Sequence, residues 1–167
     1  MNKVYLLLGS NEGNRLNWMQ QAIEQLDLKC GKIVHRSAVY QTAAWGLNEQ
    51  PDFLNMVVLL ETSLQPLELL NDIHKIEQLL GRQREVKWGQ RTLDIDILLF
   101  DDQVINLPEL TIPHGFIQER RFTLIPLAEL APDLLHPVFQ KTITTLLNEC
   151  TDPLEVHFYP QQQISTQ

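Results

Sequence analysis

The chain has 167 residues, of which 44% are hydrophobic and 20% charged, with a formal net charge of -8. This length is typical of one globular domain, which can fold without a disulfide or a structural metal. The acidic total argues against a general nucleic-acid binder, and the apolar runs fall far short of the ~20 residues of a membrane span. With no export signal and no metal-like spacing of Cys30 and Cys150, we expect free thiols and a cytoplasmic protein.

The N-terminal segment is predicted to form a strand followed by a helix. Val4–Leu8 is a short apolar run that ends in the turn Gly9–Gly13, as expected for a buried strand. From Asn14 until just before Gly31, apolar residues recur at helical spacing. The turn lacks the Lys-Ser/Thr pair and the spacing of a Walker A loop, so we do not interpret it as a phosphate-binding loop of that type.

The next elements are predicted to be two strands and a second helix. Residues 33–40 and 53–60 are rich in β-branched and aliphatic side chains, and the loop-like segment Asn48–Asp52 lies between them. A long loop therefore joins the two predicted strands. Pro66 suits a first helical turn, and one apolar face continues from there to Gly81, which suits the position after a helix end.

In residues 93–100, every second residue is aliphatic and the positions between them begin with two aspartates, a period of two that predicts a strand. Four aliphatic side chains share one face, namely Leu93, Ile95, Ile97 and Leu99. Asp94 and Asp96 then share the other face, about 6.6 Å apart. The strand is too apolar for a typical edge strand, so we expect it inside a sheet.

The order strand, helix, strand, strand, helix, strand predicts an α+β fold of the ferredoxin-like, split βαβ type. Its antiparallel sheet would carry both helices on one face and leave the second face open. Arg120–Leu130 and Lys141–Leu147 are predicted as extra C-terminal helices that cap an edge of the sheet. We expect one domain over residues 1–150 and a tail over 151–167, whose polar end Pro160–Gln167 is frayed.

The candidate chemistry is concentrated just before and within the strand at 93–100. Residues 82–91 carry a net charge of +3 against -11 for the rest of the chain, which indicates either an anion site or a solvated loop. Asp94 and Asp96 can hold Mg²⁺ that bridges nucleotide phosphates, or they form a solvated strand face. Because the cations lead directly into this strand, Arg82 and Arg91 are candidates for stabilising charge during phosphoryl transfer.

Three aromatic or imidazole side chains have more than one interpretation. Trp88 either stacks on a flat ring or pins its own loop. His114, which precedes Arg120 in a polar stretch, is the histidine best suited to bind phosphate. Without further context, Phe53 is interpreted as a core residue. No side chain stands out as a general base.

Five segments resemble those of the 6-hydroxymethyl-7,8-dihydropterin pyrophosphokinase family of the folate pathway. They are Leu8–Asn11, Gln50–Asn55, Gly81–Arg84, Trp88–Asp96 and Ile112–His114. The likeness runs from about residue 3 to about residue 148, and the Trp88–Asp96 string is long and specific. The resemblance implies the ferredoxin-like fold and an enzyme that transfers the pyrophosphoryl group of ATP to the hydroxymethyl group of the pterin and releases AMP.

The resemblance also implies which residues bind the substrates. Asp94 and Asp96 match positions that bind two Mg²⁺ ions. Positions matching ATP contacts are His74, Glu77, Arg82, Arg84, Trp88, Arg91, Ile97, Thr111, His114 and Arg120. Positions matching pterin contacts are Thr42, Ala43, Trp45, Gly46, Phe53, Asn55, Trp88, Asp94 and Phe122. Phe53 and Phe122 would sandwich the ring, and catalysis is expected to depend on Arg82, Arg91, Asp94 and Asp96.

By the same resemblance, the loops Ala43–Asp52 and Arg82–Gln90 close over the substrates and exclude water. We expect a monomer that binds ATP and the pterin, and neither nucleic acid nor a membrane. Two other functions stay open at this point: a ligand-sensing ferredoxin-like module without catalysis, and a Mg²⁺-dependent nucleotide hydrolase. Neither of them explains the aromatic pair of Phe53 and Phe122.

Overall fold

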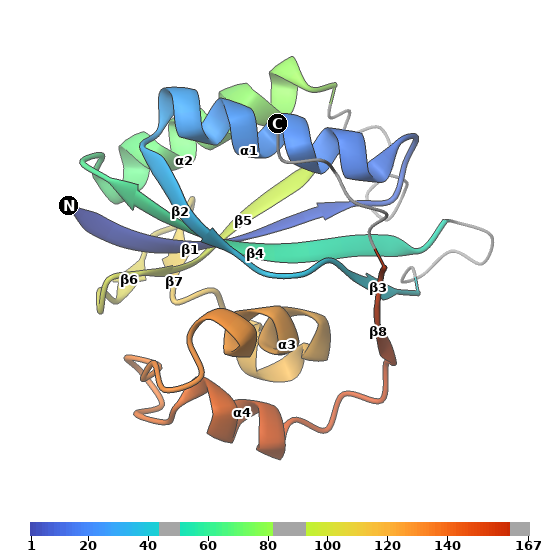
Figure 1. Cartoon of the computed structure of the whole chain (residues 1–167). Coiled ribbons are helices and arrows are strands. Elements are labelled where there is room, and N and C mark those ends of the chain that lie inside the picture. The colour runs from blue at the N-terminus through green and yellow to red at the C-terminus, as the bar shows by residue number, and fades with distance from the viewer. Residues whose placement is uncertain (44–50, 82–92, 161–167) are drawn as a thin grey trace.

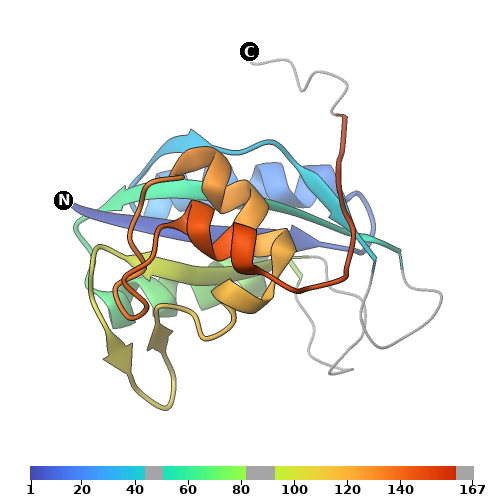
Figure 2. The same cartoon turned by 90° about the horizontal axis from the view of Figure 1, so that it is seen from below.

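A computed structural model describes residues 1–43, 51–81 and 93–160 of the chain. Within these residues, six antiparallel strands form one sheet with helices on both faces (Figures 1 and 2). The strands are β1 (Asn2–Ser10), β2 (Lys32–Arg36), β3 (Tyr40–Thr42), β4 (Phe53–Thr62), β5 (Asp94–Phe100) and β8 (Val156–Phe158). Their order is β5-β1-β4-β3-β8, and β2 also pairs with β4.

In the described part of the chain, two α-helices lie on each face of the sheet. The first face carries α1 (Arg15–Lys29) and α2 (Pro66–Leu79), and the second face carries α3 (Arg121–Leu130) and α4 (Ile143–Glu149) (Figure 1). The segment between β5 and α3 holds a small sheet of β6 (Ile105–Asn106) and β7 (Thr111–Ile112) and a 3₁₀ helix, η1 (Ile117–Glu119). The order β1-α1-β2-β4-α2-β5 is that of the predicted ferredoxin-like fold.

The helices of the first face begin and end where the sequence indicates. Asn14 caps α1, because its side-chain oxygen accepts a hydrogen bond from the Asn17 N–H at 3.2 Å. Helix α2 begins at Pro66, and Gly81 follows its end with a φ of 84°. This left-handed conformation favours glycine, which explains the sharp end of α2.

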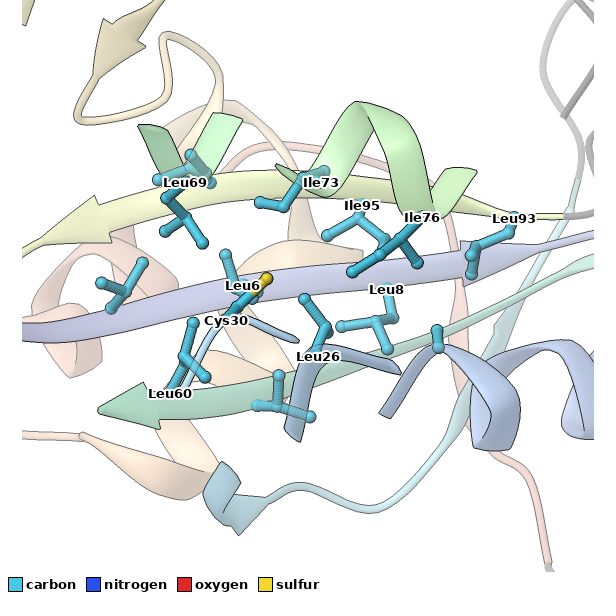
Figure 3. Close-up of a cluster of buried hydrophobic side chains, with 14 of the residues drawn as sticks. Leu6, Leu8, Leu26, Cys30, Leu60, Leu69, Ile73, Ile76, Leu93 and Ile95 are labelled. Atoms are coloured by element: carbon cyan, nitrogen blue, oxygen red, sulfur yellow. The ribbon is translucent and has the colours of Figure 1, made fainter. Parts of the chain in front are cut away.

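The larger hydrophobic core lies between the first face of the sheet and its two helices. Figure 3 shows side chains of β1, β4 and β5 meeting those of α1 and α2. The labelled core residues include Leu6, Leu8, Leu26, Leu60, Leu69, Ile73, Ile76, Leu93 and Ile95, all of them buried. Burial of one such side chain contributes about 1.5–3 kcal/mol, so this core fixes the position of β5 and its neighbours.

The second face of the sheet is also covered, which corrects the prediction that it is open and that the extra helices cap an edge. Leu124 and Leu127 of α3 and Ile143 of α4 form a second buried cluster with Leu7 and Val57 of the sheet. The central strands are apolar on both faces and therefore need a cover on both. The prediction considered only the two helices of the split βαβ motif.

The single strand predicted over residues 33–40 is interrupted in its middle. The Ser37 hydroxyl accepts a hydrogen bond from the Val57 N–H at 3.0 Å and so replaces a backbone carbonyl. The Ala38 N–H donates to Glu129 of α3 at 2.9 Å. Because these two bonds take the place of ladder bonds, β2 and β3 are separate strands.

Strand β5 lies at the edge of the sheet, so the prediction of an interior strand is wrong. Its apolar composition follows from the helices that cover both faces. Two of its backbone groups bond to other elements: the Ile95 N–H donates to Glu77 at 3.0 Å, and the Leu98 carbonyl accepts from the His114 N–H at 2.9 Å. These bonds give the edge strand partners that a second neighbouring strand would otherwise supply.

The alternation in β5 holds only up to Ile97. The register against β1 shifts after Ile97, with Leu98 as the extra residue. Leu98 and Leu99 therefore both lie in the second core, which corrects the prediction of four aliphatic side chains on one face. Asp94 and Asp96 precede this bulge and share the second face, as predicted.

Part of the predicted tail adds a strand to the sheet. In β8, Val156 pairs with Thr42 of β3, and the ring of Phe158 meets that of Tyr40 edge to face at 6.3 Å. The Tyr159 N–H donates to the Val39 carbonyl at 2.9 Å. The tail thereby covers the edge of the strand that carries Thr42.

Both cysteines are free thiols, as expected. Burial raises the pKa of the Cys30 thiol to about 11, so this side chain acts as an inert core residue. In the described ranges, no helix is both long and apolar enough to cross a membrane.

Candidate functional site

The candidate site residues on the sheet gather at one end of its second face. Asp94 of β5 pairs with Gly9 of β1, and Gly9 pairs with Asn55 of β4, so the three form one row across the sheet. Directly paired residues of antiparallel strands point to the same side. The apolar cover by α3 and α4 rests further along these strands, on Leu7 and Val57. The second face therefore changes from apolar to polar at this end.

A pocket of about 520 Å³ lies along the edge of β5. This volume is within the usual range of ligand sites, roughly 300–1,000 Å³. Its lining comes from α2, β5, the β6–β7 hairpin and the segment before α3, and includes His74, Glu77, Asp94, Asp96, Ile97, Thr111, His114 and Arg120. The structure thus brings together all the described residues that were predicted to bind ATP.

Two of the pocket residues on α2 differ in their environment. His74 is exposed, whereas Glu77 is only 2% exposed. The Glu77 carboxylate accepts the 3.0 Å hydrogen bond from the Ile95 N–H, which ties α2 to the edge strand. Glu77 therefore shapes the floor of the pocket, in addition to the substrate contact predicted for it.

His114 lines the pocket with one ring nitrogen already bonded to the backbone. Its Nδ1 accepts from the Phe116 N–H at 3.2 Å, so in the neutral ring the proton is on Nε2. Burial, and then the positive charge of Arg120, lower the pKa of His114, while the carboxylate of Asp94 opposes them. A neutral imidazole of this tautomer can donate to a phosphate oxygen.

Arg120 connects the pocket to the predicted pterin-binding aromatic residues. Its guanidinium carbon lies 4.6 Å from the centre of the Phe116 ring and 5.6 Å from that of Phe122. Stacking on two rings holds the planar guanidinium while leaving its N–H edge for hydrogen bonds. Phe122 lies in the first turn of α3 and packs partly on the second core.

Asp94 and Asp96 have the position and exposure that a magnesium site requires. Both are partly exposed, share one face of β5 and line the pocket beside His114 and Arg120. Carboxylate oxygens suit Mg²⁺, which usually binds one or two protein carboxylates and completes its shell with water and substrate phosphates. Within the described part of the chain, no group of three or more potential ligands gathers. These two residues thus fit a magnesium ion that arrives with a nucleotide.

The predicted pterin-binding residues lie on β3, β4 and α3. Asn55 and Thr42 are buried, and the Asn55 amide donates toward the Thr42 hydroxyl at 3.5 Å. Phe53 pairs directly with Thr42 and is partly exposed. Phe122 comes from α3, which packs on β3 and β4, and Ala43 is exposed at the end of β3.

The sequence reasoning missed the residues that anchor the chain where it enters β4. Arg15 donates to the Asp52 carbonyl at 2.7 Å, and Gln41 donates to the Asp52 carboxylate at 2.9 Å. Asn11 donates to the Pro51 carbonyl at 3.3 Å. The polar residues after β1 give no local signal for these contacts, which join positions 37 or more apart for Arg15 and Asn11.

Six predicted site residues lie outside the described part of the chain. They are Trp45, Gly46, Arg82, Arg84, Trp88 and Arg91. Most of the predicted lid loop at residues 43–52 and the whole basic segment 82–91, with its lid loop, fall there too. Their roles remain predictions from the sequence.

Comparison with known sequences gives a consistent match over most of the chain. The model of the 7,8-dihydro-6-hydroxymethylpterin-pyrophosphokinase (HPPK) family matches residues 5–132. The 2-amino-4-hydroxy-6-hydroxymethyldihydropteridine pyrophosphokinase of Aquifex aeolicus is 44% identical over 153 residues, which cover 90% of this chain and 94% of that protein. The protein of the same name from Bacillus subtilis is 45% identical over 130 residues, 77% of this chain and 78% of that one.

Comparison with solved structures supports the same fold. The crystal structure of wild-type Plasmodium falciparum HPPK-DHPS with SDX-DHP is similar with a TM-score of 0.73 and 21% identity. The similarity covers 89% of this chain and 43% of that chain, so the present chain spans less than half of that longer protein. At 21% identity, this similarity supports the fold alone.

Proposed function

The chain belongs to the 7,8-dihydro-6-hydroxymethylpterin-pyrophosphokinase (HPPK) family, and we propose how its site performs the reaction of that family. It is an ATP-dependent pyrophosphokinase of folate biosynthesis. The hydroxymethyl oxygen of 6-hydroxymethyl-7,8-dihydropterin bonds to the β-phosphorus of ATP and its proton is released to water, the bond from that phosphorus to the α–β bridging oxygen breaks, and AMP leaves. Family membership decides against the ligand-sensing module and the nucleotide hydrolase.

ATP is proposed to bind in the pocket along the edge of β5. The observation that carries this proposal is that carboxylates, an imidazole donor and a guanidinium line one pocket: Asp94, Asp96, His114 and Arg120. The triphosphate would lie against these four residues. The adenine and ribose would lie toward the remaining predicted contacts His74, Glu77, Ile97 and Thr111.

His114 and Arg120 are proposed to bind the phosphates in two different ways. His114 donates one hydrogen bond from Nε2, because its Nδ1 is occupied by the Phe116 N–H. The planar edge of the Arg120 guanidinium can bind two phosphate oxygens. Both groups are held before substrate arrives, which lowers the reorganisation needed as charge develops on the transferred phosphoryl group.

Asp94 and Asp96 are proposed to hold magnesium at the reacting end of ATP. Two Mg²⁺ ions are proposed, as the family resemblance implies. When bound, Mg²⁺ neutralises phosphate charge and aligns the attacking and leaving oxygens. The part of the protein is to keep two carboxylates on one face of a strand whose other face is anchored in the larger core.

The pterin is proposed to bind across the ends of β3 and β4, next to Asp94. Phe53 and Phe122 would stack on its two faces, while Asn55 and Thr42 would read its polar edge, with Ala43 beside them. Because Asp94 and Asn55 belong to one row of the sheet, this arrangement directs the hydroxymethyl end toward the carboxylates. Positioning of the alcohol against the β-phosphorus then supplies much of the rate enhancement.

The residues outside the described part of the chain complete the proposal. Arg82, Arg84 and Arg91 are proposed to bind the phosphates, with Arg82 and Arg91 stabilising the transferred group. Trp45, Gly46 and Trp88 are proposed to contact the pterin, with Gly46 at its polar edge and Trp88 contacting ATP as well. The protein is further proposed to act as a monomer.

The proposal is tested by incubating the protein with ATP, Mg²⁺ and 6-hydroxymethyl-7,8-dihydropterin and measuring AMP by chromatography. We expect AMP to form only when all three are present. Omission of the pterin is the control for hydrolysis, and chelation of Mg²⁺ is the control for the metal. AMP or ADP formed without pterin, or ATP left intact in the full mixture, would contradict the proposal.

A further inference from the structure

Gly9 lies in the middle of the row that joins the two halves of the site. It pairs with Asp94 of β5 on one side and with Asn55 of β4 on the other. Because paired Cα atoms of antiparallel strands are about 4.5–5.5 Å apart, about 10 Å separates Asp94 from Asn55 across this glycine. A side chain at position 9 would point to the same side as the two functional side chains.

The backbone of Gly9 does not itself require glycine. Among the described glycines, Gly13 and Gly81 have positive φ angles, whereas Gly9 belongs to the regular ladder of β1. A glycine inside a strand weakens that strand, since it packs no side chain and loses more entropy on folding. The reason for glycine at this position is therefore expected in the space above it.

That space is occupied by the side-chain amide of Asn55. A Cβ atom added at position 9 would lie 2.8 Å from Asn55 Oδ1, which is closer than Cβ atoms approach other atoms in proteins. The next atoms are the Leu54 carbonyl oxygen at 3.7 Å and Asn55 Cγ at 3.9 Å. Asn55 is 5% exposed, and its Nδ2 donates toward Thr42 Oγ1 at 3.5 Å, so a Cβ at position 9 would displace or rotate an enclosed amide.

We propose that Gly9 is a positioning residue for pterin recognition and that it acts through Asn55. Because Gly9 has no side chain, the Asn55 amide can lie over β1, in the same row of the sheet as Asp94. An amide offers a donor and an acceptor side by side, so its orientation decides which edge of a heterocycle it can pair with. Gly9 thereby sets which end of the ring faces the carboxylates. This inference rests on the proposed function, because it takes the ring bound at Asn55 to be the pterin.

The first test is the Gly9→Ala variant. Binding of 6-hydroxymethyl-7,8-dihydropterin is measured with Mg²⁺ and α,β-methylene-ATP, and KM and kcat are measured with ATP. We expect the Kd and KM for the pterin to rise about tenfold or more, with the Kd for α,β-methylene-ATP changed by about twofold at most. Unchanged pterin affinity would overturn the proposal. Equal losses for both ligands would also overturn it, because they would indicate general damage.

A double-variant cycle tests whether Gly9 acts through Asn55. Asn55→Ala removes the atom that the new Cβ would meet, so Gly9→Ala is expected to have little further effect in that background. The pterin Kd of the double variant should lie within about twofold of that of Asn55→Ala alone. Losses that multiply instead would show that Gly9 does not act through Asn55.

The same variants decide the matter if Gly9→Ala does not fold. Relief of the clash predicts that Asn55→Ala restores cooperative thermal unfolding to the Gly9→Ala chain. A double variant that also stays unfolded would contradict the proposal. Failure of the proposed function is recognised separately, because it would appear in the wild-type chain as the lack of pterin-dependent AMP.

Discussion

The two faces of the sheet use the same strands for different purposes. On the first face, β1 and β5 contribute core residues such as Leu8 and Ile95, and the apolar surface continues to Leu93 at the start of β5. On the second face, the apolar surface ends with the residues under α3 and α4, and Asp94 and Asn55 follow at the same strand ends. Alternate residues of one strand therefore contribute either to the core or to the candidate site. Substitutions at neighbouring positions should therefore affect either stability or substrate binding.

Helix α3 belongs to both parts of the second face. Leu124 is buried in the second core, while Arg120, just before the helix, lines the pocket and lies beside Phe122 of the first turn. Glu129 near its end accepts hydrogen bonds from β3 and from the segment before it. Damage to the cover of the second face should therefore affect pterin binding, whereas damage within the larger core of the first face should mainly lower stability.

The largest effect is expected from neutralising the two carboxylates of the second face. Asp94→Asn with Asp96→Asn should lower the rate of pterin-dependent AMP formation by about 10³-fold, because metal binding contributes several kcal/mol to such a reaction. The measurement is the single-turnover rate at saturating substrates. Asp102→Asn, which removes an exposed charge just after β5, is the matched control and should keep the rate. A double variant with near wild-type rate would remove Asp94 and Asp96 from the metal site.

A large effect of a different kind is expected on the first face. Leu8→Ala, next to Gly9 in β1, removes a fully buried side chain from the larger core. It should lower the free energy of unfolding by about 2–5 kcal/mol. Urea unfolding measures this loss, and KM values are measured on the folded fraction. KM values for ATP and pterin should match those of the wild type, and a marked rise in either would break the separation of the two faces.

An effect on both stability and substrate binding is expected from a substitution in the second core. Leu124→Ala opens a cavity under α3 and should cost about 2–5 kcal/mol, as Leu8→Ala does. Unlike Leu8→Ala, it should also raise the KM for the pterin about threefold or more, because Phe122 and Arg120 depend on the position of α3. Steady-state kinetics of the two variants at equal folded fraction make the test. Equal KM values in both variants would show that α3 does not position the site.

The smallest effect concerns the bond that joins α3 to β3. The Tyr40 hydroxyl donates to Glu129 at 2.6 Å. Burial, and then this hydrogen bond to Glu129, raise the pKa of Tyr40 from 10.0 to about 12. Because the pKa of Tyr40 is higher in the folded chain than in the unfolded chain, the contribution of Tyr40 to the free energy of unfolding is complete below pH 10. This contribution is lost as the pH rises from 10 toward 12.

Tyr40→Phe tests this contribution. The variant should cost about 1 kcal/mol at neutral pH, since one hydrogen bond is lost. As the pH rises from about 10 toward 12, the wild type should lose stability more steeply than the variant, as measured by urea unfolding. Parallel pH profiles of the two proteins would contradict the raised pKa of Tyr40.

The first face could be predicted from the sequence because its signals are local. The spacing of apolar residues, the cap at Asn14 and the glycine at 81 define α1 and α2 without reference to any distant residue. The alternation before Ile97 likewise placed Asp94 and Asp96 together on the other face. Such patterns depend on the period of a helix or strand and need no knowledge of the partner.

The missed features depend on contacts between distant parts of the chain. The cover of the second face follows from strands that are apolar on both sides, a property that does not tell which helix covers them. Strand β8 is short and mostly exposed, and it becomes a strand only by pairing with β3. The close approach of Gly9 and Asn55 follows from the register of β1 on β4. Tertiary pairing decides each of these features, and no local pattern records it.

The most direct test of the account is the identity and stoichiometry of the products of the wild-type chain. ATP, Mg²⁺ and 6-hydroxymethyl-7,8-dihydropterin are mixed with the protein, and the products are followed by mass spectrometry and ³¹P NMR. The account predicts one AMP for each pterin diphosphate formed, with no free phosphate. Pterin monophosphate with ADP, or phosphate released without a pterin product, would contradict it.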